Sequence, residues 1–470
     1  MTLRYQLNNG ILMLLPNTMV DDDCTSANPS IIEGRLGPLG RFTTLVTLFC
    51  SGLMITACTT CQPDSETFAD TPKIDDAELI KLAHTAKAEA IRLRQLPEMR
   101  PVGIKVASKD AILTYVTERL DTTDSQRLLK WTAVAFQLLG VLPDNYNMAD
   151  ELKLLLRDQV AGYYDWEKKT LFVADWLPSF LQRPTLVHEV VHALQDQHFD
   201  LGRFMEPQEG LSDIQSAIQA LIEGDATLVM ADDMLGIDAN TEDAVSMRKR
   251  LLENLATQMQ AAMQSVNAPP VIAESLLFPY AAGLKFVMYA LEHHGPKTLD
   301  TLYHEPPLST EAILHPERWF SEPRDYPQSI GFTVPTEFNL HQCSAKITET
   351  AGEFLKGTLF AQGSPRDVAT IAAAGWDGDT WMLFECGAEK RYVMAWVSIW
   401  DTHEDANEAA AALRTTPKPP LHVAVQESLV AGLWGERLGD PVGITQQLLS
   451  TVKLEPIESA PKRPGKKQPQ

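Results

Sequence analysis

Apolar side chains at helical spacing dominate the first two thirds of the chain. Between residues 124 and 139 they recur every three or four positions, and Gly140 follows where a helix would end. Ser108 stands where a helix cap is expected, just before another such segment. The predicted helices cover residues 75–95, 109–120, 124–139, a segment opened by Pro184, and residues 211–234, 243–266 and 271–293.

Strands are predicted where β-prone residues gather or where apolar and polar residues alternate. Residues 160–174 contain two β-rich arms around a polar turn, which is typical of a hairpin. The pattern changes beyond Thr333, where two paired strands, an Ala-rich helix and a further strand are expected at 380–386, 392–400, 402–414 and 421–429. We therefore predict an α+β protein, with a mostly helical domain over 75–330 and a smaller α+β domain over 331–455.

The N-terminal residues have the parts of an export signal. Arg35 and Arg41 precede a short apolar run over 42–57, too short for a typical membrane-spanning helix, and Cys58 follows. The last four residues of this stretch, Ile-Thr-Ala-Cys, resemble a bacterial lipobox, which implies lipidation of Cys58. An ordinary signal peptide and an anchor helix are the alternatives. We expect an extension and signal peptide over 1–58, then a tether over 59–74, in a lipoprotein of the bacterial cell envelope, with the outer membrane facing the periplasm favoured.

Charge and cysteine content narrow the choice of partners. The chain has 470 residues, 44% of them hydrophobic, so it can bury a large core. Its formal net charge of −22 argues against binding nucleic acid, and the basic residues near the end fall in a tail over 456–470 that we expect to be disordered. Cys343 and Cys386 could pair in an oxidising compartment, although two free thiols are the alternative.

The strongest chemical motif is the run His188-Glu189-Val190-Val191-His192. Two histidines four residues apart lie on one face of a helix, where both rings can bind one zinc ion. Glu189, beside the first histidine, is suited to act as general base on a water at the metal.

A catalytic zinc needs a third protein ligand. His198 stands where an extended histidine motif would place it, but Gln195 replaces the glycine that such a motif uses to turn the chain. Glu223 is the better candidate, because it lies among Ala, Leu and Ile on a second helix, where an unpaired carboxylate is costly to bury.

These motifs together resemble a known family. The HEVVH run followed by Glu-Gly-Asp-Ala at 223–226 is similar to the gluzincin branch of zinc peptidases, and to a group of poorly characterised bacterial and archaeal surface proteins with the zincin fold. The resemblance implies that residues 170–174 form an edge strand over the active-site cleft, which would pair with an extended substrate. Where that branch has an aspartate that orients a ligand histidine, this chain has Thr227. Asp196 or Asp225 could orient the ligand histidine instead. The alternative for both is a solvated charge on the helix surface.

A residue that stabilises the reacting oxyanion is also expected. Tyr280 and His315 are the candidates, with His293 and His294 behind them, although a core tyrosine and a structural loop histidine are the plain alternatives. The predicted function is a membrane-anchored zinc peptidase acting on a peptide or protein substrate. A zinc hydrolase with another substrate and a catalytically silent binding lipoprotein are the other hypotheses.

Overall fold

The computed structural model describes residues 11–14, 76–176, 179–205, 209–237, 244–250 and 268–460. Cys58, the apolar run before it and the predicted tether lie outside these residues. Of the helix expected over 243–266, residues 244–250 are described and are helical. Within the described residues the protein is α+β, as the sequence predicts.

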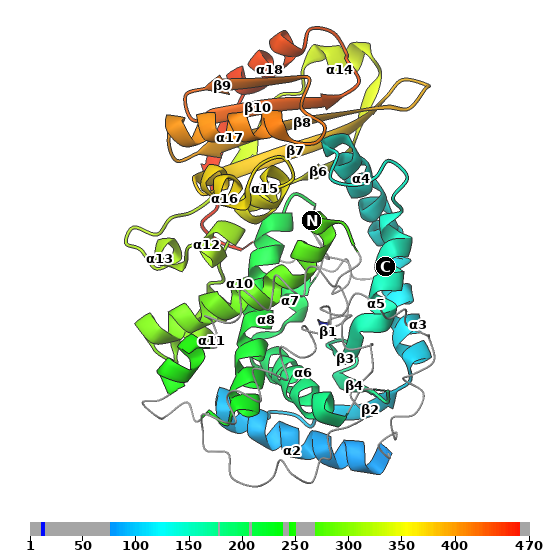
Figure 1. Ribbon diagram of the computed structural model, residues 1–470, viewed down its shortest axis with the longest axis vertical. Helices are drawn as coiled ribbons and strands as arrows, with labels where there is room; N and C mark the ends of the chain where they lie inside the picture. The colour runs from blue at the N-terminus through cyan, green and yellow to red at the C-terminus, as the bar shows by residue number, and fades with distance from the viewer. Residues whose placement is uncertain are drawn as a thin grey trace, which may run out of the picture.

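Helices form the part of the molecule below the C-terminal sheet in Figure 1. The predicted caps are confirmed, since Ser108 accepts a hydrogen bond from the amide of Ala111 and Gly140 ends its helix in the left-handed conformation. The helices here are α2 (Asp76–Arg94), α3 (Lys109–Leu120), α4 (Thr123–Leu139), α5 (Met148–Gln159), α6 (Ser179–Phe199), α7 (Gly202–Met205), α8 (Ser212–Leu235), α10 (Pro270–His294), α11 (Thr298–His304), α12 (Thr310–Leu314) and α13 (Pro316–Trp319).

A four-stranded sheet packs against α6, and its strand order is β1-β3-β4-β2. The predicted hairpin is confirmed, because β3 and β4 pair antiparallel. The expected edge position of residues 170–174 is wrong, since β4 lies between β3 and the parallel strand β2, and both of its sides are hydrogen-bonded. The strands are β1 (Ile11–Leu14), β2 (Gly103–Ala107), β3 (Val160–Asp165) and β4 (Thr170–Ala174).

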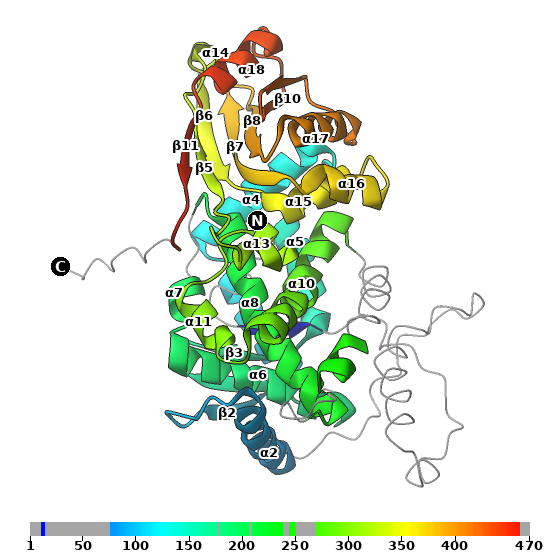
Figure 2. The same ribbon diagram turned by 90° about the vertical axis from the view of Figure 1, so that its left-hand side faces the viewer.

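Helices α6, α8 and α10 pack in succession beside this sheet (Figures 1 and 2). Pro184 does not open α6 but lies inside it, because residues 179–183 add a turn before it. Within the described residues, α10 is the one helix long and apolar enough to cross a membrane. However, 72% of its most apolar window is buried, so in this structure it is a core helix.

The C-terminal residues form a five-stranded sheet, ordered β6-β7-β8-β10-β9, at one end of the long axis (Figures 1 and 2). The strand expected over 421–429 is two elements, because the chain turns at Glu427, whose φ is 53°, and re-enters the sheet as β10. The elements are β6 (Cys343–Glu349), α14 (Thr336–Leu340), α15 (Gly352–Phe360), α16 (Arg366–Ala373), β7 (Trp376–Cys386), β8 (Arg391–Trp400), α17 (His403–Thr415), β9 (His422–Gln426), β10 (Leu429–Gly435) and α18 (Pro441–Ser450).

Two short strands form a separate ladder beside the five-stranded sheet (Figure 2). β5 (Gln328–Gly331) pairs antiparallel with β11 (Lys453–Pro456), so the C-terminal unit begins a few residues before position 331. Residues 456–457 belong to this ordered ladder rather than to a disordered tail, because the amide of Ile457 also bonds to the carbonyl of Pro327. Residues 461–470 of the predicted tail lie outside the described residues.

The C-terminal sheet shares its core with the helical part. One cluster of buried apolar residues runs from Leu79 in α2 to Trp434 in β10, and α4 packs on the sheet. The tryptophans of β7 and β8 belong to this core; Trp376, Trp381, Trp396 and Trp400 are each less than 5% exposed. Cys343 and Cys386 face each other across β6 and β7 and are joined in a disulfide.

Candidate metal centre

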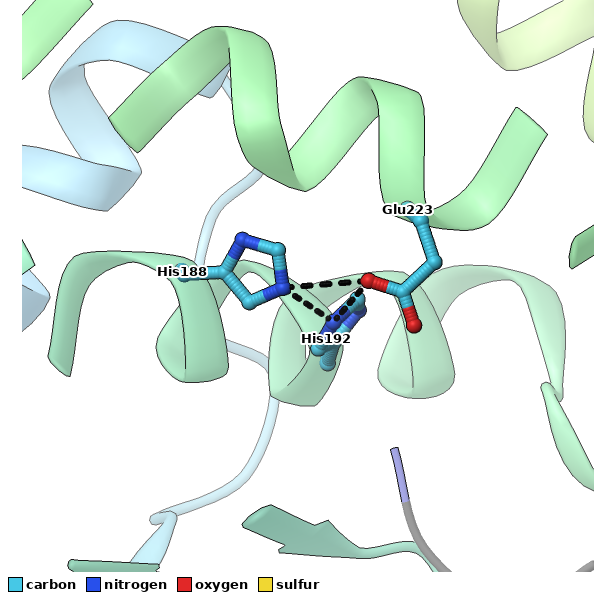
Figure 3. Close-up of side chains that lie close together, drawn as sticks. All are labelled: His188, His192 and Glu223. Atoms are coloured by element: carbon cyan, nitrogen blue, oxygen red, sulfur yellow. Dashed lines mark hydrogen bonds and ion pairs between the residues drawn. The ribbon is translucent and has the colours of Figure 1, made fainter. Parts of the chain in front are cut away.

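Two helices bring His188, His192 and Glu223 to one point (Figure 3). Nε2 of His188 is 3.1 Å from Oε2 of Glu223 and 3.0 Å from Nε2 of His192, and the last is 3.5 Å from the same carboxylate oxygen. The histidines share a face of α6 because they are four residues apart, and Glu223 faces them from the middle of α8. All three side chains are buried. This arrangement could hold a metal ion.

The charges of these groups suit a cation. Burial lowers the pKa of His188, so its ring is neutral and can offer a lone pair. Burial alone would raise the pKa of Glu223, but the neighbouring His192 and the contact with His188 lower it overall, which favours the ionised carboxylate. Its second oxygen, Oε1, has no hydrogen-bond partner within the described residues. An ionised carboxylate with an unsatisfied oxygen in a dry site favours a bound cation.

Glu189 lies on the sheet side of the same helix. Its side chain is buried, and a Cβ built on Gly162 of β3 would be 3.8 Å from its Cγ. It directly follows the candidate ligand His188 on α6. The residue expected to act as general base is therefore buried between a candidate ligand and β3.

Tyr280, in α10, lies near His188. Its ring centroid is 6.2 Å from that of His188, with 31° between the planes. Burial, followed by the negative charges of Glu223 and Glu189, raises the pKa of Tyr280 well above its ordinary value. Its hydroxyl therefore keeps its proton and remains a hydrogen-bond donor next to the two carboxylates.

The structure does not bring His315 to the metal centre, which corrects the sequence-based expectation. His315 ends α12, and its Nε2 is 2.9 Å from Oε1 of Glu353 in α15. α12 meets α8 at its first turn, where the backbone and hydroxyl of Thr310 bond to Asp213. Glu223 is ten residues further along α8, a rise of about 15 Å. His315 therefore belongs to the junction with the C-terminal sheet.

The other histidine candidates are also elsewhere. Nε2 of His198 is 2.8 Å from the carbonyl oxygen of Pro97, so His198 is a structural side chain at the end of α6. His293 and His294 are exposed at the last turn of α10, and Nδ1 of His293 lies 3.0 Å from the carbonyl oxygen of Tyr289.

The residues beside the ligands also differ from expectation. Asp225 is not a solvated charge; it is fully buried and ion-paired with Arg94, 2.7 Å away. Asp196 bonds to Tyr164 and Lys169 rather than to a ligand histidine.

The partner of His192 is Gln195, whose Oε1 is 2.9 Å from Nδ1 of the ring. From the sequence, Gln195 stood out only as the residue that replaces the glycine of an extended histidine motif. Because residues three positions apart lie on the same helix face, the spacing of Gln195 and His192 could have indicated that their side chains meet.

Comparison with known proteins adds one match. A family model described as a domain of unknown function (DUF8575) matches residues 341–437, which span the five-stranded C-terminal sheet from β6 to β10. No curated protein and no solved structure matches the chain. The match does not include the residues of the candidate metal centre.

Proposed function

We propose that the chain is a zinc-dependent hydrolase, and specifically a peptidase. The observation that carries this proposal is the convergence of two imidazole nitrogens and one carboxylate oxygen within 3.0–3.5 Å of one another. Ligands about 2.0–2.1 Å from a tetrahedral zinc ion are about 3.3–3.4 Å apart, so the three atoms fit three corners of such a site. Two histidines and a glutamate are also a ligand set that zinc hydrolases use.

The residues around these ligands can perform a hydrolysis. Zinc in this site would lower the pKa of a water in its open position and polarise a carbonyl group. Glu189 would accept the proton of the attacking water on its carboxylate and pass it to the leaving group. The Tyr280 hydroxyl would donate a hydrogen bond to the carbonyl oxygen as negative charge develops on it.

The peptide substrate is supported by the HEVVH and Glu-Gly-Asp-Ala motifs, whose combination resembles gluzincin peptidases. β4 cannot pair with an extended substrate in the expected way, because both of its sides are already occupied. The net charge of −22 opposes binding to nucleic acid. We also propose that Cys58 is lipidated and anchors the protein in a bacterial cell envelope, on the strength of the lipobox-like residues alone.

The test combines metal analysis with a peptide library. The parent protein should bind one zinc per chain and cleave library peptides. Glu223→Ala should lose the zinc, because two histidines alone make an incomplete site. Glu189→Gln keeps nearly the same shape, so it should retain zinc while turnover falls by about 10²–10⁴.

Two outcomes would contradict the proposal. Full activity in Glu189→Gln on a substrate that the parent cleaves would exclude the general-base mechanism. A parent that binds zinc but cleaves no peptide would exclude the peptidase and favour a non-peptide substrate or a binding role.

A further inference from the structure

A glutamine amide connects the two helices that carry the metal ligands. Oε1 of Gln195 in α6 is 2.9 Å from Nδ1 of His192. Its amide nitrogen donates to the carbonyl oxygen of Ile222, at 3.1 Å, and to Oδ2 of Asp225, at 3.0 Å, both in α8. Gln195 is completely buried, so water does not compete for these contacts.

The orientation of the Gln195 amide follows from its partners. A backbone carbonyl can only accept a hydrogen bond, so the NH₂ group must face Ile222, and the same nitrogen then also reaches Asp225. The amide oxygen then faces His192 and can only accept. Nδ1 of His192 therefore carries the ring proton, and the lone pair is on Nε2, the atom that faces His188 and Glu223.

Asp225 is itself held firmly in place. Nε of Arg94, from α2, is 2.7 Å from one oxygen of Asp225, and the Tyr303 hydroxyl donates to the other at 2.9 Å. Burial lowers the pKa of Arg94, but the charge of Asp225 raises it overall, so the guanidinium stays charged. The guanidinium also reaches Asp300, at 2.8 Å. The negative charge of Asp225 is thus compensated, and a neutral amide separates it from His192.

We infer that Gln195 is a positioning residue of the metal centre. It fixes His192 in the tautomer that can bind metal through Nε2, and it holds α6 in register with α8 beside Glu223. Its effect passes through His192, since its hydrogen bonds go to His192, Ile222 and Asp225. The inference rests on the proposed metal site, but it concerns metal affinity and geometry rather than hydrolysis.

The test replaces the amide with a side chain of similar length that makes no such hydrogen bonds. Gln195→Met should weaken zinc binding by about 10–100-fold in competition with a chromophoric chelator. It should also change the visible absorption of the cobalt-substituted protein, which reports ligand geometry. The matched control is Gln182→Met, at a glutamine on the same helix that is 1% exposed. That control should leave zinc affinity and the cobalt spectrum unchanged, whatever its effect on the melting temperature.

A second variant separates positioning from simple packing. Gln195→Glu keeps an acceptor for Nδ1 of His192 but loses the donor that faces Asp225. Its metal-free form should be less stable than the parent, while its zinc affinity should stay closer to the parent than that of Gln195→Met. If Gln195→Met does not fold, the zinc affinity of Gln195→Glu tests the inference in its place. A folded Gln195→Glu protein that has lost zinc binding would overturn the inference.

The remaining outcomes distinguish this inference from the proposed function. A Gln195→Met protein with the zinc affinity and cobalt spectrum of the parent would overturn the positioning role and leave the metal site standing. A parent protein that binds no zinc would overturn both.

Discussion

Gly224 of α8 and Gly283 of α10 lie in direct backbone contact. A Cβ built on Gly224 would be 2.2 Å from the carbonyl carbon of Gly283, and one built on Gly283 would be 1.9 Å from the carbonyl oxygen of Ala220. Real Cβ atoms do not approach backbone so closely, so only glycine permits this helix crossing. Glu223 is next to the contact, and Tyr280 is one turn before it on α10. The glycine pair therefore sets how closely the two helices approach at the metal centre.

Gly224→Ala should consequently destabilise the protein by at least about 1–3 kcal/mol, the usual cost of overpacking a core. Urea unfolding monitored by circular dichroism would measure the change. Gly357→Ala in α15 is the matched control, because a Cβ there would be 3.6 Å from its nearest neighbour, the Cβ of Ala373. That control should be neutral or stabilising by about 0.5–1 kcal/mol, as expected for glycine replaced by alanine within a helix. Equal effects in the two variants would contradict the close-contact explanation.

Tyr280→Phe should reduce turnover without removing the metal. The ring packs beside His188 and is retained in the variant, so only the hydroxyl is lost. Loss of one hydrogen-bond donor to a developing oxyanion typically lowers kcat by about 10²–10³. Steady-state kinetics and zinc analysis of the same preparation would check both parts. An unchanged kcat would remove Tyr280 from the mechanism.

His315→Ala should affect folding rather than zinc or catalysis. The variant leaves the buried carboxylate of Glu353 without its 2.9 Å partner, and such a group costs about 1–3 kcal/mol. Thermal melting should therefore show a less stable protein, whose zinc content and kcat match those of the parent. A large fall in kcat with an unchanged melting temperature would show instead that His315 acts in the reaction.

The stability of the junction between α8 and the C-terminal unit should depend on pH through Asp213. Burial, opposed by hydrogen bonds from Thr310 and assisted by the charge of Asp379, raises the pKa of Asp213 to about 7. Between the unfolded pKa of about 4 and this value, the native carboxyl keeps a proton that the unfolded chain has lost. The native state then binds more protons, so stability falls as pH rises, by at most about 1.4 kcal/mol per pH unit.

Asp213→Asn removes this titration. Urea unfolding of parent and variant at pH 5, 6 and 7 should show that the parent loses more stability over the range. Parallel pH profiles would mean that Asp213 has the same proton affinity in the folded and unfolded states.

The sequence predicted elements and motifs well where the information is local. Helix caps such as Ser108, the β3–β4 hairpin and the α+β class follow from neighbouring residues. The ligand histidines, four residues apart, follow from helix geometry alone. Glu223 could be proposed because a carboxylate among apolar residues requires a partner.

Features that depend on distant contacts could not be predicted in the same way. The role of Asp225 was left open between orienting a ligand histidine and being a solvated charge, because its partner Arg94 is 131 residues away in the sequence. His315 was placed at the site on its residue type, and only the structure shows that Glu353 holds it elsewhere. The edge position of residues 170–174 failed because β2, from well before the hairpin, pairs with β4. Each error concerns which segments meet in space.

Helix α8 extends from the C-terminal unit to the candidate metal centre. Its first turn is bonded to β6 of the C-terminal unit through Ser212 and Glu349, and to α12 through Asp213 and Thr310. Its middle carries Glu223. One continuous helix therefore joins the contact with the C-terminal unit to the carboxylate. The unit matched by the family of unknown function thus contacts the helix that carries Glu223, although it supplies none of the proposed ligands.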